Sequence, residues 1–272
     1  MNLTSPSQVK AWCIENGFHP NKVMGQNFLV DRNVLEAIVD AGLEGVDVVP
    51  PSVLEIGPGL GVMTEEMLRR GCRVTAVEKD PVLAGRLAEA LGGPSGLTVV
   101  AGDALAALDR GTLQLGLFDA MVSNLPYQAG TRILLDIVAA RAPKAITVLV
   151  QAEVAERLAA KEGSKTRGLA GVWAQLDYDV RVVRRVSASC FWPRPRVGSC
   201  VVRLDRHGRG EVLDEAERRL FRSLTKRAFS QRRKQLGNVF KYMVQSTARA
   251  EELSNEDWIA LTKELVETKG IM

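Results

Sequence analysis

Short apolar runs alternate with amphipathic stretches along the first 150 residues, and this alternation predicts strands that alternate with helices. Strands are expected over Val53–Ile56, Arg73–Val77, Leu97–Val100, Leu117–Val122 and Ile146–Val150. Helices are expected from Asp31 to Gly42, from the turn after Ile56 to Arg70, from Asp80 to Gly92, and over Thr131–Ala140. This order of elements predicts an α/β fold built on a parallel, doubly wound sheet.

The pattern changes after residue 150. Helices are expected over Glu153–Lys161 and Leu169–Leu176. Two further strands, Asp179–Val186 and Ser199–Leu204, are predicted to close as a pair around a proline-rich stretch at residues 191–196.

The last quarter of the chain has a helical pattern without a convincing strand. A linker is expected from His207 to Gly210. A chain of 272 residues is long enough for one large domain and one small one. We therefore predict a sheet domain over residues 1–206 and a small all-α domain over residues 207–272.

Composition favours an ordinary globular protein, with 46% hydrophobic and 25% charged residues. Four scattered cysteines and two histidines show no metal-ligand spacing, so we expect free thiols in a reducing cytoplasm and no metal site. The stretch from Met1 to Asn16 lacks the long apolar centre of a signal peptide, and no window approaches the ~20 apolar residues of a membrane span. We expect a cytoplasmic monomer without a membrane partner.

Positive charge is concentrated in the C-terminal third. Residues 181–210 carry a net charge of +7 and residues 221–250 carry +8, whereas the whole chain carries +4. Basic segments of this kind are typical of proteins that bind a polyanion, above all nucleic acid. The alternative is a solvated basic face without a partner, although two such segments weaken it.

Polar residues and glycines follow four of the expected strands at the edge where ligands bind in open α/β sheets. These residues are Gly57, Glu78, Asp103 and Asn124. Gly57 and Gly59 belong to a glycine-rich turn that lets the backbone approach a ligand and leaves helix-start amides free. The turn departs from the dinucleotide fingerprint, because Val62 stands where that spacing requires glycine.

Glu78 and Asp103 fit a nucleoside ligand. An acid about 20 residues past the glycine turn is placed to accept hydrogen bonds from ribose hydroxyls, which is the position of Glu78. Asp103 ends the third strand and is a candidate acceptor for an adenine amino group. Each acid alone has an ordinary alternative as a surface carboxylate or a helix cap.

The turn Asn124-Leu125-Pro126-Tyr127 follows the fourth strand. Pro126 fixes its own φ and pushes Leu125 toward an extended conformation, so the carbonyl groups become fixed acceptors beside the Asn124 amide. Tyr127 offers an aromatic face to a base, worth roughly 1–3 kcal/mol, and Phe191 is a candidate for the opposite face. The alternatives are a plain loop breaker and a core phenylalanine.

These features occur in register on successive strands, which makes coincidence improbable. Together they indicate a methyltransferase that uses S-adenosylmethionine (SAM) and acts on an exocyclic amine. Hydrogen bonds from an adenine amino group to the Asn124 side-chain oxygen and the Leu125 carbonyl would aim the nitrogen lone pair at the methyl group. A base presented in this way must be unpaired or flipped out.

The chain resembles the KsgA family, the small-subunit ribosomal RNA adenine dimethyltransferases, over nearly its whole length. The matching runs are Gly25 to Leu29, Glu55 to Gly61, Glu78 to Asp80, Gly102 to Ala104, Asn124 to Tyr127, Gln151 to Leu158, Phe191 to Ser199, and Ala228 to Lys234.

The resemblance implies a Rossmann-like methyltransferase domain, a helical C-terminal domain, and SAM-dependent dimethylation of two adjacent adenines in a terminal hairpin loop of small-subunit rRNA. It places the family's cofactor contacts on Asn27, Leu29, Gly57, Glu78, Asp103 and Asn124. It also implies that Arg232, Arg233 and Lys234 contact rRNA phosphates on an immature small subunit.

The chain departs from the family after Tyr127, where Gln128-Ala129-Gly130 replaces the usual Asn and, two residues further on, a small hydroxyl residue. Met24 also replaces the more usual Phe or Leu. The nearest rival is an Erm-like methyltransferase of large-subunit rRNA. A DNA adenine methyltransferase would show Asp-Pro-Pro-Tyr and a target-recognition insert, whereas a ribosome-assembly factor with secondary catalysis would need the same basic surface.

Overall fold

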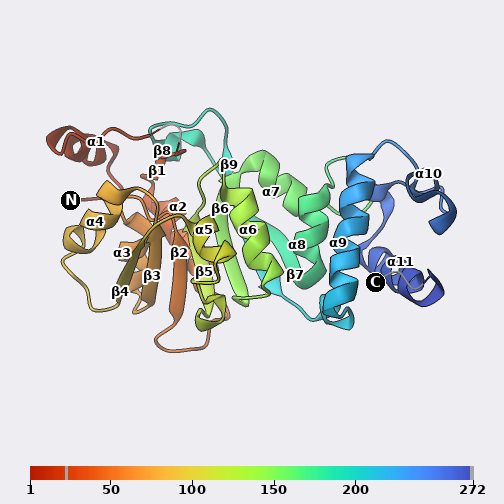
Figure 1. Cartoon of the computed structure of the whole chain (residues 1–272). Coiled ribbons are helices and arrows are strands. Elements are labelled where there is room, and N and C mark those ends of the chain that lie inside the picture. The colour runs from red at the N-terminus through yellow and green to blue at the C-terminus, as the bar shows by residue number, and fades with distance from the viewer. Residues whose placement is uncertain (22–23, 270–272) are drawn as a thin grey trace. The chain divides into compact units, whose positions relative to one another are not determined.

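The computed structural model describes residues 1–21 and 24–269 and divides the chain into two compact units (Figure 1). The first unit comprises Met1–Ala155 and Arg181–Asp205, and the second comprises Glu156–Val180 and Arg206–Met272. The division therefore differs from a single cut after residue 206, because Glu156–Val180 groups with the C-terminal helices. The physical reason is that Val172 and Leu176 in this segment belong to the same apolar core as Phe221.

Nine strands form two sheets in the part of the chain that the structure describes. In chain order the strands are β1 (Phe28–Leu29), β2 (Ser52–Ile56), β3 (Arg73–Glu78), β4 (Leu97–Ala101), β5 (Ala120–Asn124), β6 (Ala145–Gln151), β7 (Tyr178–Val186), β8 (Phe191–Trp192) and β9 (Ser199–Arg206). The large sheet has the order β4-β3-β2-β5-β6-β9-β7, with parallel pairing from β4 to β6 and antiparallel pairing of β6 with β9. The prediction of a doubly wound sheet closed by two late strands is confirmed.

The helices follow the expected alternation. In chain order they are α1 (Pro6–Glu15), α2 (Arg32–Leu43), α3 (Val62–Arg69), α4 (Pro81–Ala90), α5 (Ala104–Asp109), α6 (Gly130–Ala139), α7 (Ala152–Leu158), α8 (Leu169–Asp177), α9 (Glu215–Ser230), α10 (Leu236–Phe240) and α11 (Asn255–Lys269). Short 3₁₀ turns are η1 (Leu115–Leu117), η2 (Ala188–Cys190), η3 (Arg209–Val212), η4 (Lys241–Met243) and η5 (Ala250–Glu252). The side chain of Asp31 accepts from Val34 N at the start of α2, as its capping role predicts.

Four differences from the sequence-based expectations lie in the first unit, and one of them is helix α5, which was not predicted between β4 and β5. The strand expected from Leu117 begins only at Ala120, because Leu117 ends a 3₁₀ turn with its side chain 67% exposed. Helix α1 was not predicted. The lead-in, residues 17–30, was expected to be irregular, but it contains β1, which pairs with β8 in a separate two-stranded sheet.

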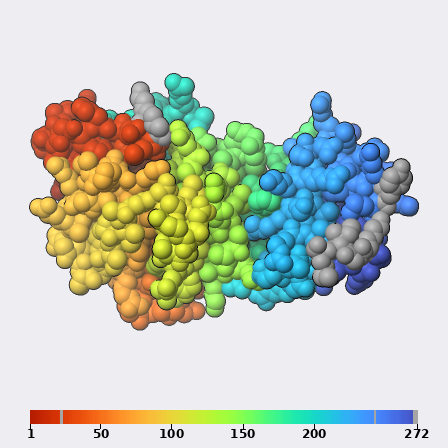
Figure 2. Space-filling view, viewed as in Figure 1, coloured from red at the N-terminus to blue at the C-terminus, as the bar shows by residue number. Residues whose placement is uncertain are grey.

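Helix α1 is held by an apolar cluster of its own. Val9 and Cys13 of α1 share this cluster with Phe28 of β1 and with Leu60 and Leu83. Figure 2 shows the red N-terminal residues lying directly on the orange surface of the sheet unit. The cluster places the start of the chain over the segments that follow β2 and β3.

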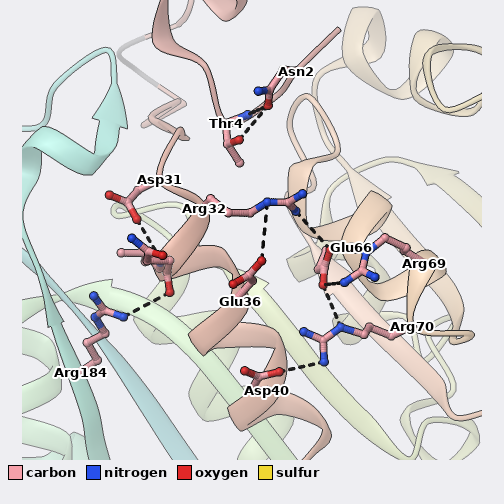
Figure 3. A network of polar contacts seen from close by, with 12 residues as sticks. Asn2, Thr4, Asp31, Arg32, Glu36, Asp40, Glu66, Arg69, Arg70 and Arg184 are labelled. Carbon is pink, nitrogen blue, oxygen red and sulfur yellow. Dashed lines mark hydrogen bonds and ion pairs between the residues drawn. The ribbon is translucent and has the colours of Figure 1, made fainter.

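Helix α3, which follows the glycine-rich turn, is tied to α2 by charge. Glu66 of α3 is buried and accepts from Arg69 Nε at 2.9 Å and from Arg70 Nε at 2.8 Å, while Arg32 of α2 lies at 3.4 Å (Figure 3). Arg70 also donates to Asp40 of α2 at 2.8 Å. These guanidinium groups, Arg69 first, lower the pKa of Glu66 to about 2.

The second unit has a helical core of its own. Trp258, Phe221 and Leu236 lie at its centre. A buried ion pair joins Arg218 of α9 to Asp177 of α8, with both guanidinium–carboxylate contacts at 2.8 Å. The linker expected from His207 to Gly210 instead enters the turn η3, where the buried Gly210 carbonyl also accepts from Arg218.

Among the described residues, no helix is both long and apolar enough to cross a membrane. The same residues contain no cluster of three or more His, Cys, Asp or Glu side chains that would suit a metal ion.

Candidate active site

A cavity of about 370 Å³ lies beyond the carboxyl ends of β2, β3, β4 and β5. Its lining includes the predicted cofactor residues and the whole turn after β5: Asn27, Leu29, Gly57, Gly59, Glu78, Asp103, Asn124, Leu125, Pro126 and Tyr127. The cavity also borders on Met24, Gln128 and Ala129. The volume suits a small organic ligand.

The glycine-rich turn has a backbone that only glycine adopts without strain. Gly59 has φ +61° and Gly61 has φ +91°. A Cβ atom at Gly61 would lie 2.6 Å from Leu87, and one at Gly59 would lie 3.1 Å from the ring of Phe28. The turn therefore runs close to α4 and β1, and its residues 57–60 line the cavity.

Glu78 is fixed by backbone donors on both carboxylate oxygens. Gly59 N donates to Oε2 at 3.0 Å and Asp80 N donates to Oε1 at 2.8 Å. Burial, more than any other influence, raises the pKa of Glu78 above that of a free glutamate. A carboxylate has lone pairs beyond these two bonds, so it retains acceptors for the hydroxyl groups of a ligand.

Asp103 serves as a helix cap and also borders the cavity, so both sequence interpretations describe it. Its Oδ1 accepts from Leu105 N at 2.9 Å at the start of α5. Its Oδ2 lies 2.8 Å from the Lys79 ammonium group. The hydrogen bond from Lys79 lowers the pKa of Asp103, which stays ionised at neutral pH.

A buried carboxyl group also links the two elements on either side of the glycine-rich turn. Glu55 of β2 accepts from the Thr64 hydroxyl of α3 at 2.6 Å. Burial raises the pKa of Glu55 to about 8, so the group is protonated at neutral pH. The bond joins the strand before the turn to the helix after it.

The lead-in loop contacts both the side of the cavity near Glu78 and the side near Asn124. Gln26 Nε2 donates to Asp80 Oδ2 at 2.8 Å, beside Glu78. Asn27 accepts at its backbone oxygen from Asn124 Nδ2 at 3.1 Å. The pattern of residues did not predict this role for Asn27, because nothing in the local sequence indicates a partner 97 residues away.

The bond to Asn27 orients the Asn124 side chain. With Nδ2 donating to Asn27, the Oδ1 atom is left as an acceptor. Within residues 1–21 and 24–269, neither this oxygen nor the Leu125 carbonyl oxygen receives a hydrogen bond from the protein. The Pro126 carbonyl differs, because it accepts from Gly130 N at 2.7 Å. Two adjacent acceptors are therefore free at the cavity.

Tyr127 is anchored at its far end. Its hydroxyl group lies 2.7 Å from the Ser199 Oγ atom in the first residue of β9. Burial raises the pKa of this phenol, which is therefore neutral. An anchored ring offers a fixed aromatic surface at the cavity.

Phe191 does not join these residues. Its side chain is buried in the apolar core of the first unit, where β8 pairs Phe191 with Leu29. It is absent from the described cavity lining. The structure agrees with the alternative interpretation of Phe191 as a core residue.

The basic run Arg232-Arg233-Lys234 follows α9 in the second unit, and its residues differ in whether they are already bonded to the protein. Arg232 donates to the Lys165 carbonyl at 2.6 Å and lies 3.4 Å from Glu251. Arg233 and Lys234 are exposed, and Lys234 bonds only to Gln231 nearby, as far as the described residues go. Two of the three predicted rRNA contacts are thus available to a partner, whereas Arg232 is engaged within its own unit.

Comparison with known proteins first gives a match in sequence. Residues 17–268 match the family model described as "Ribosomal RNA adenine dimethylase". "Ribosomal RNA small subunit methyltransferase A" of Deinococcus radiodurans is 42% identical over 245 residues, which cover 89% of this chain and 79% of that protein.

Two solved structures share the fold. A dimethyladenosine transferase from Plasmodium falciparum gives a TM-score of 0.76 at 22% identity, covering 89% of this chain and 98% of that one. The 23S rRNA methyltransferase ErmE gives a TM-score of 0.64 at 27% identity, covering 88% of this chain and 99% of that one. Both confirm a methyltransferase sheet followed by C-terminal helices.

Proposed function

The chain belongs to the ribosomal RNA adenine dimethylase family, and on that premise we propose that it dimethylates the N6 amino groups of two adjacent adenines in the 3′-terminal hairpin loop of small-subunit rRNA. Membership makes it a SAM-dependent rRNA adenine dimethyltransferase. The choice of small-subunit rRNA is supported by the 42% identity to a small-subunit enzyme.

The residues at the cavity fit SAM. The glycine-rich turn carries main-chain groups to the cavity, Glu78 offers a carboxylate for ribose hydroxyls, and Asp103 offers one for the adenine amino group. Asn27, Leu29, Gly57 and Asn124 complete the proposed contacts. When bound, SAM supplies a methyl group on a sulfonium, which is electrophilic without help from a metal.

The observation that carries the proposal is the pair of free acceptors at Asn124 Oδ1 and the Leu125 carbonyl. An exocyclic amine has two N–H groups, so it can donate one to each acceptor. Such bonds favour a pyramidal nitrogen, restore its lone pair and hold it in line with the methyl group. Orientation of this kind contributes several kcal/mol, ~7–11 at the intramolecular limit.

Aromatic stacking holds the base in the same scheme. Tyr127, anchored through Ser199, is the proposed stacking surface for the flipped adenine. Phe191 would need to leave the core to reach the opposite face, so the structure gives it no part in this proposal.

The second unit is the proposed rRNA-binding part, acting through phosphates on an immature small subunit. Arg233 and Lys234 are its exposed candidates, with Arg232 as their support. We further propose that the enzyme acts as a cytoplasmic monomer in late small-subunit assembly.

The alternative substrate is large-subunit rRNA, which the similarity to ErmE favours at 27% identity. The test is incubation with labelled SAM and either purified small or large subunits, followed by mapping of the modified nucleoside. We expect label in dimethyladenosine of the small subunit. Label confined to the large subunit would support the alternative, and binding to immature subunits without transfer would leave only an assembly role.

A further inference from the structure

Gly130, the first residue of α6, packs directly on the backbone of Leu125. A Cβ atom built at Gly130 would lie 2.8 Å from the Leu125 Cβ and 3.6 Å from its carbonyl carbon. A separation below 3.0 Å between such atoms is not tolerated, so one of the two residues would have to move. Gly130 therefore lets the start of α6 come closer to this turn than any other residue would.

Leu125 has little freedom to yield through its side chain. The side chain is 2% exposed and packed in the interior, and the clashing atom is its Cβ, which moves only with the backbone. Leu125 N also donates to Leu149 O on the neighbouring strand β6 at 3.2 Å. Pro126, next in the chain, restricts the conformation of Leu125 further.

Gly130 also closes the turn from the other side. Its N–H donates to the Pro126 carbonyl at 2.7 Å, so the helix start and the turn form one hydrogen-bonded loop. A shift of Gly130 therefore acts on the Pro126–Tyr127 peptide plane through this bond, and through the close contact with Leu125 it acts on the neighbouring Leu125–Pro126 peptide plane. That plane carries the Leu125 carbonyl, one of the two free acceptors at the cavity.

We propose that Gly130 is a positioning residue that sets the Leu125 carbonyl in line with Asn124 Oδ1 for the substrate amine. The inference rests on the proposed function and deepens it. In the family pattern a small hydroxyl residue is usual at this position, whereas this chain has no Cβ atom there. Gly130 is therefore the residue of the departure at Gln128-Ala129-Gly130 that contacts the acceptor turn.

The test compares Gly130→Ala with Gly85→Ala. Gly85 lies within α4, and a Cβ there would meet no atom within 4 Å, so the control makes the same chemical change without a contact. For Gly130→Ala we expect the single-turnover rate of methyl transfer to fall roughly 10- to 100-fold, since misplacement by about 1 Å costs that much. SAM affinity by calorimetry and the KM for the RNA substrate should stay within about threefold.

Gly130→Ser should lose as much rate as Gly130→Ala, because both add the same Cβ atom. A crystal structure of Gly130→Ala should show the Leu125 carbonyl displaced relative to the wild type. An unmoved carbonyl, or an unchanged rate, would overturn the proposal. So would equal losses of rate and SAM affinity, which would indicate general damage to the cavity.

The wild-type assay separates this inference from the proposed function. If the wild type and Gly85→Ala modify no small-subunit adenine, the substrate assignment fails. The position of the Leu125 carbonyl in the Gly130→Ala crystal still decides whether Gly130 sets it.

Discussion

At the scale of single residues, the site is defined by which polar atoms the protein leaves without a partner. Within the described residues, Asn124 donates to the lead-in loop and keeps its oxygen free, and the adjacent Leu125 carbonyl is free as well. Glu78, in contrast, is held by two backbone donors and still has capacity for more. The Asn124 and Leu125 oxygens suit an amine that donates two hydrogen bonds, and the Glu78 carboxylate suits hydroxyl groups.

Asn124→Ala removes one of the two amine acceptors. We expect methyl transfer to fall by at least about 100-fold, in the range found when one positioned hydrogen-bonding group of an active site is removed. SAM affinity should change only a few-fold, because the other proposed cofactor contacts remain. Single-turnover kinetics and calorimetry measure the two effects, and near-normal turnover would remove Asn124 from its proposed role.

Glu78→Gln removes the charged acceptor proposed for the ribose. SAM binding should weaken roughly 10- to 100-fold, the typical worth of hydrogen bonds to a charged group. The pKa of Glu78 is raised, so in the wild type SAM affinity should fall on acidification from a higher pH than a free glutamate would give. Calorimetry across pH should show this fall in the wild type and a flat profile in Glu78→Gln. Equal affinities at neutral pH would refute the assignment.

At the scale of elements, the strands were predictable and the short pairings were not. Runs such as Val53–Ile56 and Ile146–Val150 are buried strands in parallel sheets, so their composition alone identified β2 and β6. The two-residue strands β1 and β8 are too short to leave a pattern, and they form only because distant segments meet. Helix α1 has its buried positions at Val9 and Cys13 alone, so its amphipathic signal is weak.

The ion pairs around Glu66 fix α3 against α2 and so hold the helix that follows the glycine-rich turn (Figure 3). Glu66→Gln should lower stability at pH 7 by roughly 2 kcal/mol, since the native state stabilises the ionised form by more than one pKa unit. A pKa lowered to about 2 gives stability that is present above pH 4.5 and disappears as pH falls toward 2.

Denaturant unfolding at several pH values tests this expectation. The wild type and Glu66→Gln should differ most at neutral pH and converge as pH falls through about 2. A difference that does not depend on pH would show that packing, not charge, accounts for the loss.

At the scale of the whole molecule, the sequence predicted two parts but not which segments belong to each part. A linear pattern shows where helices lie, yet it does not show that α8 shares a core with α9 and α11. Nor did the run at residues 232–234 show that Arg232 is already engaged by Glu251 and Lys165. Charge density is visible in a sequence, whereas the pairing of each charge requires the fold.

Arg233→Gln combined with Lys234→Gln should weaken rRNA binding and reduce the slope of log K against log salt by about 2, since each side chain is expected to neutralise one phosphate. A control with the same change in charge is Lys10→Gln with Lys144→Gln, which replaces exposed residues of the first unit. The control should leave the slope nearly unchanged. Filter binding over a range of salt measures both, and an unaltered slope in the first variant would mean that these side chains do not meet RNA.

The bridge from Asn27 to Asn124 has a consequence for how the protein is made. The partner of Asn27 is synthesised 97 residues later, and Ser199, the partner of Tyr127, follows 72 residues after that tyrosine. Synthesis runs from the N-terminus. A nascent chain that has only its glycine-rich turn and Glu78 outside the ribosomal tunnel therefore lacks both of these hydrogen bonds. Competence to hold a nucleoside therefore develops late in translation, when the strand that starts at Ser199 emerges.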